Sequence, residues 1–152
     1  MPRIDFYTLE PNSRGDRYLL TCRLVERIRE KGLRILIHCP DGESARHIDR
    51  LLWTFRQESF LPHAILGQDS DTELTPVLIS RDGSPDGESQ VLINLAPDIP
   101  PFFARFDRVC EPVDQDPALL AAGRGKFKRY RDQGYPLGHH PVRLGSTDTD
   151  GW

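Results

Sequence analysis

Hydrophobic positions recur with two different periods along the chain, and their alternation predicts an α/β fold. Short runs of apolar and β-branched residues, typical of strands, occupy residues 3–9, 33–39, 76–80, 90–96 and 108–113. Apolar residues at helical spacing occupy residues 16–31, 41–55 and 117–134, and a shorter helix entered by proline is expected over residues 100–106. Strands that alternate with helices favour a three-layer domain in which helices flank a mostly parallel sheet.

The predicted elements form one domain followed by a tail. A chain of 152 residues is long enough for a single packed core. We assign the α/β domain to residues 1–135, because the remaining residues lack any hydrophobic period. Residues 136–152 are rich in Gly and Asp, and we expect them to form a flexible C-terminal tail.

The segment after the second predicted strand argues against nucleotide chemistry. Parallel sheets often bind nucleotides beyond their strand ends, but this use requires a glycine-rich turn that lets phosphate approach a helix N-terminus. Residues 40–46 read "PDGESAR", and their acids Asp41 and Glu43 would repel a phosphate. We therefore expect a topology like that of nucleotide-binding domains without a phosphate loop, a cofactor or catalysis. An α/β enzyme or nucleotide-binding protein with an unrecognised site is the alternative.

Cysteine and histidine residues show no metal-binding pattern. Cys22, Cys39 and Cys110 are far apart, and the five histidines do not place ligands on one helix or strand face. No apolar run approaches the length of a membrane span, and the N-terminus is too polar for a signal peptide. We expect a cytoplasmic protein that binds no metal and no membrane.

The charge distribution limits any basic function to a local surface. The formal net charge of −3 argues against general, charge-driven binding to DNA. The segment "RGKFKRYR" (124–131) nevertheless carries five cations and no acid. In a helix, one face is shared by its residues Arg124, Phe127, Lys128 and Arg131.

Two ligands suit this face of the last helix. A cationic stripe with one aromatic ring binds single-stranded nucleic acid by stacking. An acidic peptide that ends in an apolar residue fits better, because one short stripe offers few phosphate contacts. Lys126 and Arg129 point away from the stripe, and we expect both to lie in solvent, so that Lys126→Ala should matter little for binding.

Trp53 occupies an unusual position on the helix over residues 41–55. Five apolar residues form the stripe that faces the sheet: Ala45, Ile48, Leu51, Leu52 and Phe55. Trp53 lies about 130° from the centre of that stripe, beside Arg46 and Arg50. It is either an exposed binding residue or is covered by the following loop, residues 56–75.

Two segments carry a resemblance to a known family. "LLWTFRQESFLPH" (51–63) and "RGKFKRYRDQGY" (124–135) resemble the chi subunit of bacterial DNA polymerase III holoenzyme, and the order of elements agrees over residues 3–135. The resemblance implies a non-catalytic accessory subunit that binds the psi subunit and, through psi, the clamp loader. It also implies binding to the acidic C-terminal tail of single-stranded DNA-binding protein, which ends in Pro-Phe, and no sequence-specific contact with nucleic acid.

The resemblance also implies site residues. The tail-binding pocket would carry over to Trp53, Phe60, Val113, Arg124, Phe127, Lys128 and Arg131. Phe127 stands where the family can have Tyr, which removes a hydroxyl and keeps the ring. The psi surface has no equally clear signature. We assign it to Phe102, Phe103 and Phe106, because "PPFFARF" (100–106) holds more rings than one short helix face can bury.

Overall fold

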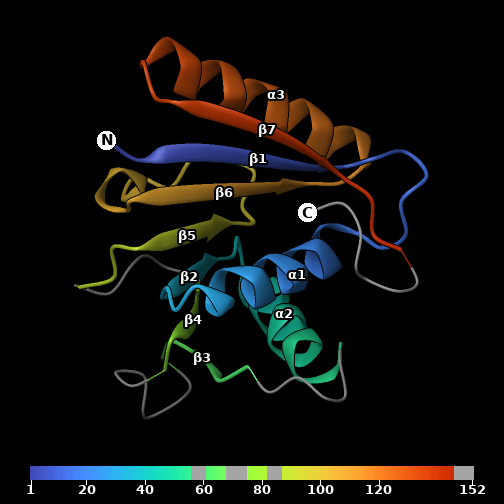
Figure 1. The fold of residues 1–152 in the computed structure, drawn as a ribbon, viewed down its shortest axis with the longest axis vertical. Coiled ribbons are helices and arrows are strands. Elements are labelled where there is room, and N and C mark those ends of the chain that lie inside the picture. Colours follow the sequence, from blue (N-terminus) through green and yellow to red (C-terminus); the bar gives the residue numbers. More distant parts are fainter. Residues whose placement is uncertain (56–60, 68–74, 82–86, 146–152) are drawn as a thin grey trace.

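The computed structural model describes residues 1–55, 61–67, 75–81 and 87–145. Its elements follow one another along the chain (Figure 1) as β1 (Arg3–Leu9), α1 (Arg17–Glu30), β2 (Ile35–His38), α2 (Gly42–Thr54), β3 (His63–Ile65), β4 (Val77–Ser80), β5 (Val91–Asn94), the 3₁₀ turn η1 (Phe103–Arg105), β6 (Arg108–Val113), α3 (Pro117–Asp132) and β7 (Leu137–Val142). Each long helix begins at an aspartate, because the carboxylates of Asp16, Asp41 and Asp116 accept bonds from the first free amides.

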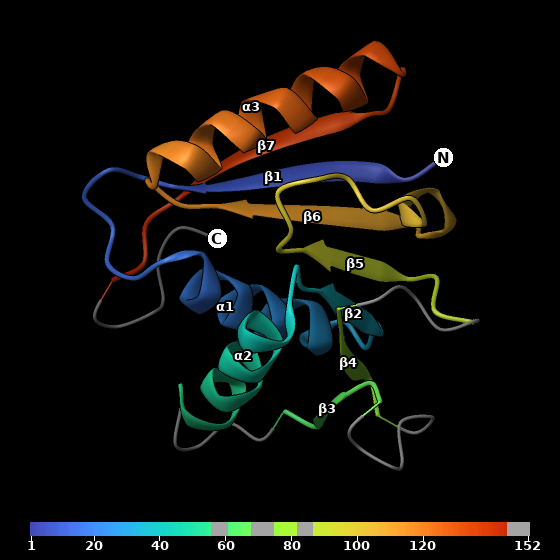
Figure 2. The same cartoon turned by 180° about the vertical axis from the view of Figure 1, so that it is seen from behind.

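The strands in the described ranges form one sheet of seven, in the order β3-β4-β2-β5-β6-β1-β7. All the strand pairs are parallel, so the predicted α/β class is confirmed and the sheet is more uniformly parallel than expected. The views in Figures 1 and 2 place α3 beside β1 and β7 at one end of the sheet, and α2 beside β3 and β4 at the other.

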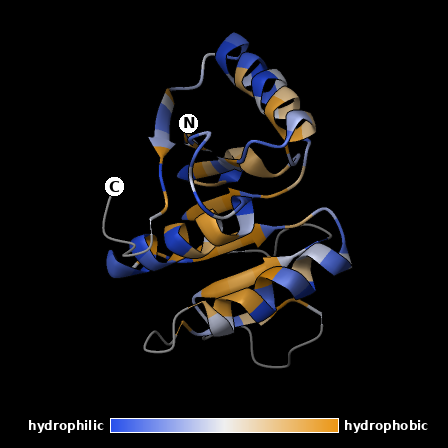
Figure 3. Cartoon of the chain, turned by 90° about the vertical axis from the view of Figure 1, so that its right-hand side faces the viewer, coloured by the Kyte–Doolittle hydropathy of each residue, from blue (hydrophilic) through white to orange (hydrophobic). Residues whose placement is uncertain are grey.

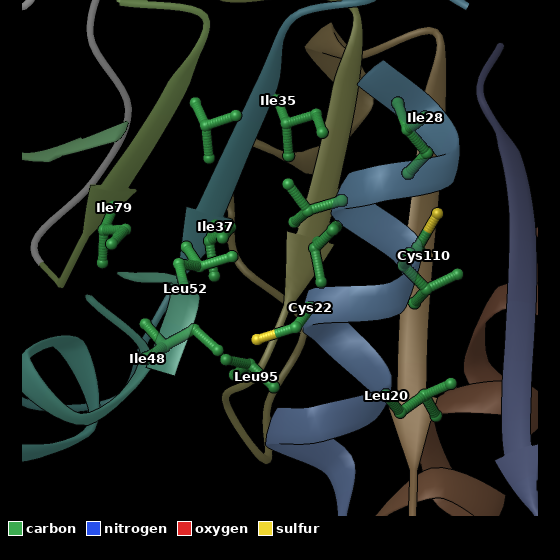
Figure 4. Packing of buried hydrophobic residues seen from close by; sticks show 14 of the residues in the cluster. Leu20, Cys22, Ile28, Ile35, Ile37, Ile48, Leu52, Ile79, Leu95 and Cys110 are labelled. Carbon is green, nitrogen blue, oxygen red and sulfur yellow. The ribbon is translucent and has the colours of Figure 1, made fainter. Parts of the chain in front are cut away.

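The sheet separates two hydrophobic cores, because successive side chains of a strand point to opposite faces. On one face, Ile35 and Ile37 pack with residues of α1 and α2, as Figure 4 shows for Leu20, Ile28, Ile48 and Leu52. On the other face, Leu36 belongs to a core with Tyr130 of α3 and with Phe106. Figure 3 shows the resulting pattern of hydrophobic strands between helices that carry hydrophilic residues. α1 and α2 thus cover one face, and α3 covers the other.

The C-terminal segment differs from the predicted flexible tail. Leu137–Val142 form β7, which pairs with β1 at the edge of the sheet, so the sheet continues beyond residue 135. The segment has no apolar period because an edge strand is buried on few of its positions. β3 also escaped prediction, since it is three residues long. The helix expected over 100–106 is reduced to the single turn η1.

A buried carboxylate fastens β7 to the sheet. Asp5 of β1 is 2% exposed and accepts bonds from Arg3 Nε at 3.1 Å, Arg108 Nε at 3.0 Å and His140 Nε2 at 2.9 Å. Burial alone would raise the pKa of Asp5, but the bond from His140 and the charge of Arg108 hold that pKa below its usual value. Gly138 lies against this cluster, and a Cβ there would collide with the Asp5 carboxylate.

Candidate protein-binding surface on α3

The inward face of α3 carries a buried polar network. Glu111 of β6 is fully buried and accepts bonds from Lys126 Nζ at 2.6 Å, Tyr130 Oη at 2.9 Å and Asn94 Nδ2 at 2.9 Å. Lys126 also donates to the carbonyl oxygen of Ala96 at 3.0 Å. Burial and the Glu111 charge raise the pKa of Tyr130, so its hydroxyl remains a donor. This network fixes the position of α3 against the sheet.

Lys126 therefore corrects the sequence prediction. We expected its side chain in solvent, but Lys126 is 8% exposed and points into the domain. The reason lies in the helical spacing, because Gly123, Lys126 and Tyr130 are the buried residues of α3 and recur at intervals of three and four. The Lys126 ammonium group can be buried there because it forms an ion pair with Glu111. Arg129 is exposed, as expected.

A pocket of about 290 Å³ opens between α3 and strands β1, β6 and β7. It is lined by Phe6, Thr8, Val113, Leu120, Gly123, Arg124, Phe127 and His139. The rings of Phe6 and Phe127 meet edge to face, with centroids 5.2 Å apart. A Cβ on Gly123 would lie 3.3 Å from Val113 Cγ2, so a glycine here lets α3 approach β6 closely. The pocket thus combines apolar walls with a cation, Arg124, at its rim.

Three of the predicted site residues come together in this pocket, namely Val113, Arg124 and Phe127. Lys128 and Arg131 are exposed on the same helix without lining the pocket. Arg131 Nε lies 3.6 Å from the carboxylate of its neighbour Asp132. In the described part of the chain, no acidic side chain pairs with Arg124 or Lys128. Both cations therefore face solvent beside an apolar pocket.

Trp53 does not belong to this pocket, which corrects the prediction that it would wall the site together with Phe127. The indole is 49% exposed at the end of α2, where its ring centroid lies 4.2 Å from that of His63 in β3. Four strands separate β3 from β1, and α2 covers the opposite face of the sheet from α3. The indole is thus about half exposed, and His63, which lies within residues 56–75, covers part of it. Phe60 lies outside the described residues.

The three phenylalanines proposed for psi differ in exposure. Phe106 is only 2% exposed and packs in the core beneath α3, so it is not available as a surface anchor, and that assignment was wrong. Phe102 and Phe103 are half-buried. The Phe103 ring contacts Tyr130 and Tyr135 edge to face, with centroid distances of 5.4 and 5.2 Å. The chain leaves η1 in extended conformation at Phe106, which turns that ring inward.

Sequence reasoning missed the pocket residues contributed by strands β1 and β7. Phe6 and Thr8 come from β1, and His139 comes from β7, which had been taken for part of a loose tail. The register pairs Phe6 with His139 across the two strands, so both side chains point to the α3 face. Strand pairing is the signal that locates them, and it is not visible in the hydrophobic pattern of residues 137–142.

The described residues were also considered for a metal site, a membrane span and reactive cysteines. No group of three or more His, Cys, Asp or Glu side chains suited to a metal ion occurs among them. No helix in the described ranges combines the length and apolar character needed to span a membrane. The three cysteines are buried, and burial raises the pKa of Cys39 and Cys110 to about 12. Those thiols pack as small apolar groups.

Comparison with known proteins gives consistent matches along the chain. A family model described as "DNA polymerase III chi subunit, HolC" matches residues 1–138. "DNA polymerase III subunit chi" of Pseudomonas aeruginosa is 37% identical over 140 residues, covering 92% of this chain and 96% of that protein. The protein of the same name from Haemophilus influenzae is 32% identical, covering 87% and 92%. That of Escherichia coli is 26% identical, covering 90% and 96%.

Solved structures with the same fold are distant in sequence. The crystal structure of T4 UvsW superposes with a TM-score of 0.67 at 10% identity, covering 95% of this chain and 42% of that one. Domain 2 of the DEAD-box helicase Mss116p, bound to an RNA duplex, gives a TM-score of 0.58 at 9% identity, covering 97% and 66%. At such low identity the likeness concerns the fold alone.

Proposed function

The chain belongs to the DNA polymerase III chi subunit family, and from this membership we propose that it is a non-catalytic adaptor of the replicative polymerase. In this proposal it binds the psi subunit, and psi connects it to the clamp loader. Its second partner is the acidic C-terminal tail of single-stranded DNA-binding protein. The observation that carries the tail assignment is the apolar pocket beside α3 with Arg124 at its rim and Lys128 on the next turn.

The size of the pocket favours one side chain as its occupant. Pockets for drug-sized ligands span about 300–1,000 Å³, and this pocket lies just below that range at about 290 Å³. A terminal phenylalanine would enter between the Phe127 ring and Val113, where edge-to-face aromatic contact is favourable. Its carboxylate would then meet Arg124 at the rim.

The exposed cations of α3 suit the acids that precede a terminal phenylalanine. Four residues of helix rise by about 6 Å, so Arg124, Lys128 and Arg131 follow one another along a face at roughly the spacing of an extended dipeptide. Charge-assisted hydrogen bonds from such side chains to carboxylates are about twice as strong as neutral ones. An acidic peptide can thus run along the helix while its last ring fills the pocket.

The rival function, nucleotide binding, finds little support at the N-terminus of α2. Asp41 caps this helix by accepting bonds from the amide and hydroxyl of Ser44, both at 2.7 Å. These bonds lower the pKa of Asp41, so the helix end carries a carboxylate where a nucleotide phosphate would need free amides. A phosphate would be repelled from that end of the sheet.

Fluorescence anisotropy with a labelled peptide of the acidic tail tests the proposed function. The wild-type chain should bind the full peptide and should bind a peptide without its terminal Phe at least tenfold more weakly, because the ring supplies most of the apolar burial. Raising the salt concentration should weaken binding moderately, since few charges take part. Tighter binding to a bare oligonucleotide than to the peptide, or a rise in melting temperature with nucleotides alone, would contradict the proposal.

Psi binding is expected to depend on the half-buried rings of η1. Truncation of Phe102 or Phe103 to Ala should weaken the complex with psi by roughly 2 kcal/mol, the loss typical of an aromatic anchor. Tail-peptide binding should stay within twofold of wild type, since neither ring lines the α3 pocket. Isothermal titration with purified psi measures the effect, and melting curves verify the fold. Unchanged psi affinity in both folded variants would refute this surface.

A further inference from the structure

His139 closes the pocket from the side opposite α3. It lies on the edge strand β7, is exposed, and is held by a contact of 3.2 Å between its Nε2 and Thr8 Oγ1. Arg124 approaches the same pocket from α3. A ligand in the pocket therefore lies between a permanent cation and a side chain that can become one. We propose that His139 is a pH-dependent contact for the carboxylates of the bound acidic peptide. This inference rests on the proposed function of the pocket.

The register of β7 sets this arrangement. His139 pairs with Phe6, whose ring forms one wall of the pocket, and His140 pairs with Tyr7. Because neighbours along a strand point to opposite faces, the two histidines are divided between the two sides of the sheet. His140 stacks on Tyr7 with centroids 4.7 Å apart and donates to Asp5. It holds β7 in place while His139 remains turned toward the pocket.

The charged groups around His139 are mostly cationic. Arg124 is the charged side chain of α3 at the pocket, and none of the pocket-lining residues is acidic. His139 also borders the opposite side of the sheet edge. The titratable groups there are Tyr7 and Asp5 of β1, Arg27 and Glu30 of α1, Lys31 directly after α1, Arg108 of β6 and His140 of β7 itself. Asp5 is already paired with Arg3, Arg108 and His140.

These surroundings couple peptide binding to proton uptake. A peptide carboxylate in the pocket would form a charge-assisted bond with the protonated ring of His139. Peptide and proton then favour each other's binding by the same factor, as linkage requires. Histidine side chains ordinarily change charge close to neutral pH, whereas the acids of the peptide remain ionised there.

The test is tail-peptide anisotropy from about pH 8 to about pH 6 at constant ionic strength, a window in which histidine ordinarily titrates. Wild type should bind about threefold to tenfold more tightly at the lower pH. His139→Gln keeps a polar side chain, and its affinity for the peptide should no longer increase toward the lower pH. His47→Gln, on α2, is the matched control and should retain the full dependence. A peptide with an amidated C-terminus should show a smaller dependence.

The outcomes separate this inference from the proposed function. If wild type fails to bind the peptide at any pH, the proposed function itself is wrong. If wild type binds and its affinity does not change with pH, or if His139→Gln retains the wild-type dependence, the role of His139 is refuted. Melting temperatures of each variant at both ends of the pH range show whether a lost dependence reflects unfolding. A lost dependence in a folded His139→Gln variant supports the inference.

Discussion

Replacing Lys126 with methionine should lower the free energy of unfolding by about 3–5 kcal/mol. The ammonium group of Lys126 is the partner of the fully buried Glu111, at 2.6 Å. Its removal leaves a carboxylate that has bonds from Tyr130 and Asn94 but no balancing charge. Domains of this size are stable by only about 5–15 kcal/mol, so the loss is a large share of the total. Urea denaturation followed by circular dichroism measures it.

Two further variants identify the buried charge as the cause. Lys126→Met combined with Glu111→Gln removes both charges and keeps an oxygen that accepts from Tyr130 and Asn94. This double variant should be more stable than Lys126→Met alone, because replacing a buried ion pair costs far less than breaking it. Arg129→Met makes the same kind of change on the exposed side of α3 and should stay within about 0.5 kcal/mol of wild type. Equal stability of Lys126→Met and Arg129→Met would show that the ion pair is unimportant.

The second large effect is expected on the affinity of the chain for the tail peptide. Arg124→Ala and Lys128→Ala should each weaken binding about tenfold or more, because a charge-assisted hydrogen bond contributes about 1.5–3 kcal/mol. Phe127→Ala should weaken binding by a similar factor, since this ring forms a wall of the pocket. Psi binding should be unaffected in all three variants. Anisotropy of the labelled peptide and titration with psi provide the two readouts.

An exposed cation elsewhere on the molecule serves as the control. Arg50 of α2 is exposed on the opposite face of the sheet from α3. Arg50→Ala removes the same net charge, so it reports how much of any loss is due to general electrostatic attraction. If Arg50→Ala weakens peptide binding as much as Lys128→Ala does, the α3 surface is not the binding site of the tail peptide. The same conclusion follows if Lys128→Ala binds the peptide like wild type.

Helical periodicity could predict the outer face of α3 because the relevant residues lie close in sequence. Arg124, Phe127 and Lys128 share a face whatever the rest of the chain does. The same period places Lys126 with Gly123 and Tyr130 on the buried side. That assignment was missed because lysine is seldom buried, and the partner that permits burial, Glu111, lies fifteen residues away on another element. Burial of a charge is a property of the tertiary structure.

The placement of Trp53 shows a second limit of sequence patterns. The spacing of α2 correctly put the indole away from the sheet-facing stripe, and it is exposed. Which face of the sheet a helix covers depends on the handed crossovers between strands, and these are fixed only by the strand order. Side chains on two helices can therefore be assigned to one site from sequence although the helices lie on opposite faces of the sheet, as α2 and α3 do. Strand pairing likewise decides that β7 and His139 complete the pocket.

The docking of β7 has a consequence for the solubility of the chain. β1 is seven residues long and almost wholly buried, with β6 on one side and β7 on the other. A chain that ended at residue 135 would leave β1 as an open edge, the kind of exposed apolar strand that pairs with other molecules and aggregates. In the complete sheet β7 forms this edge instead. Its exposed positions are His139 and Pro141, and Pro141 offers no amide to a neighbouring chain. We therefore expect β7, "LGHHPV", to disfavour self-association through this edge of the sheet.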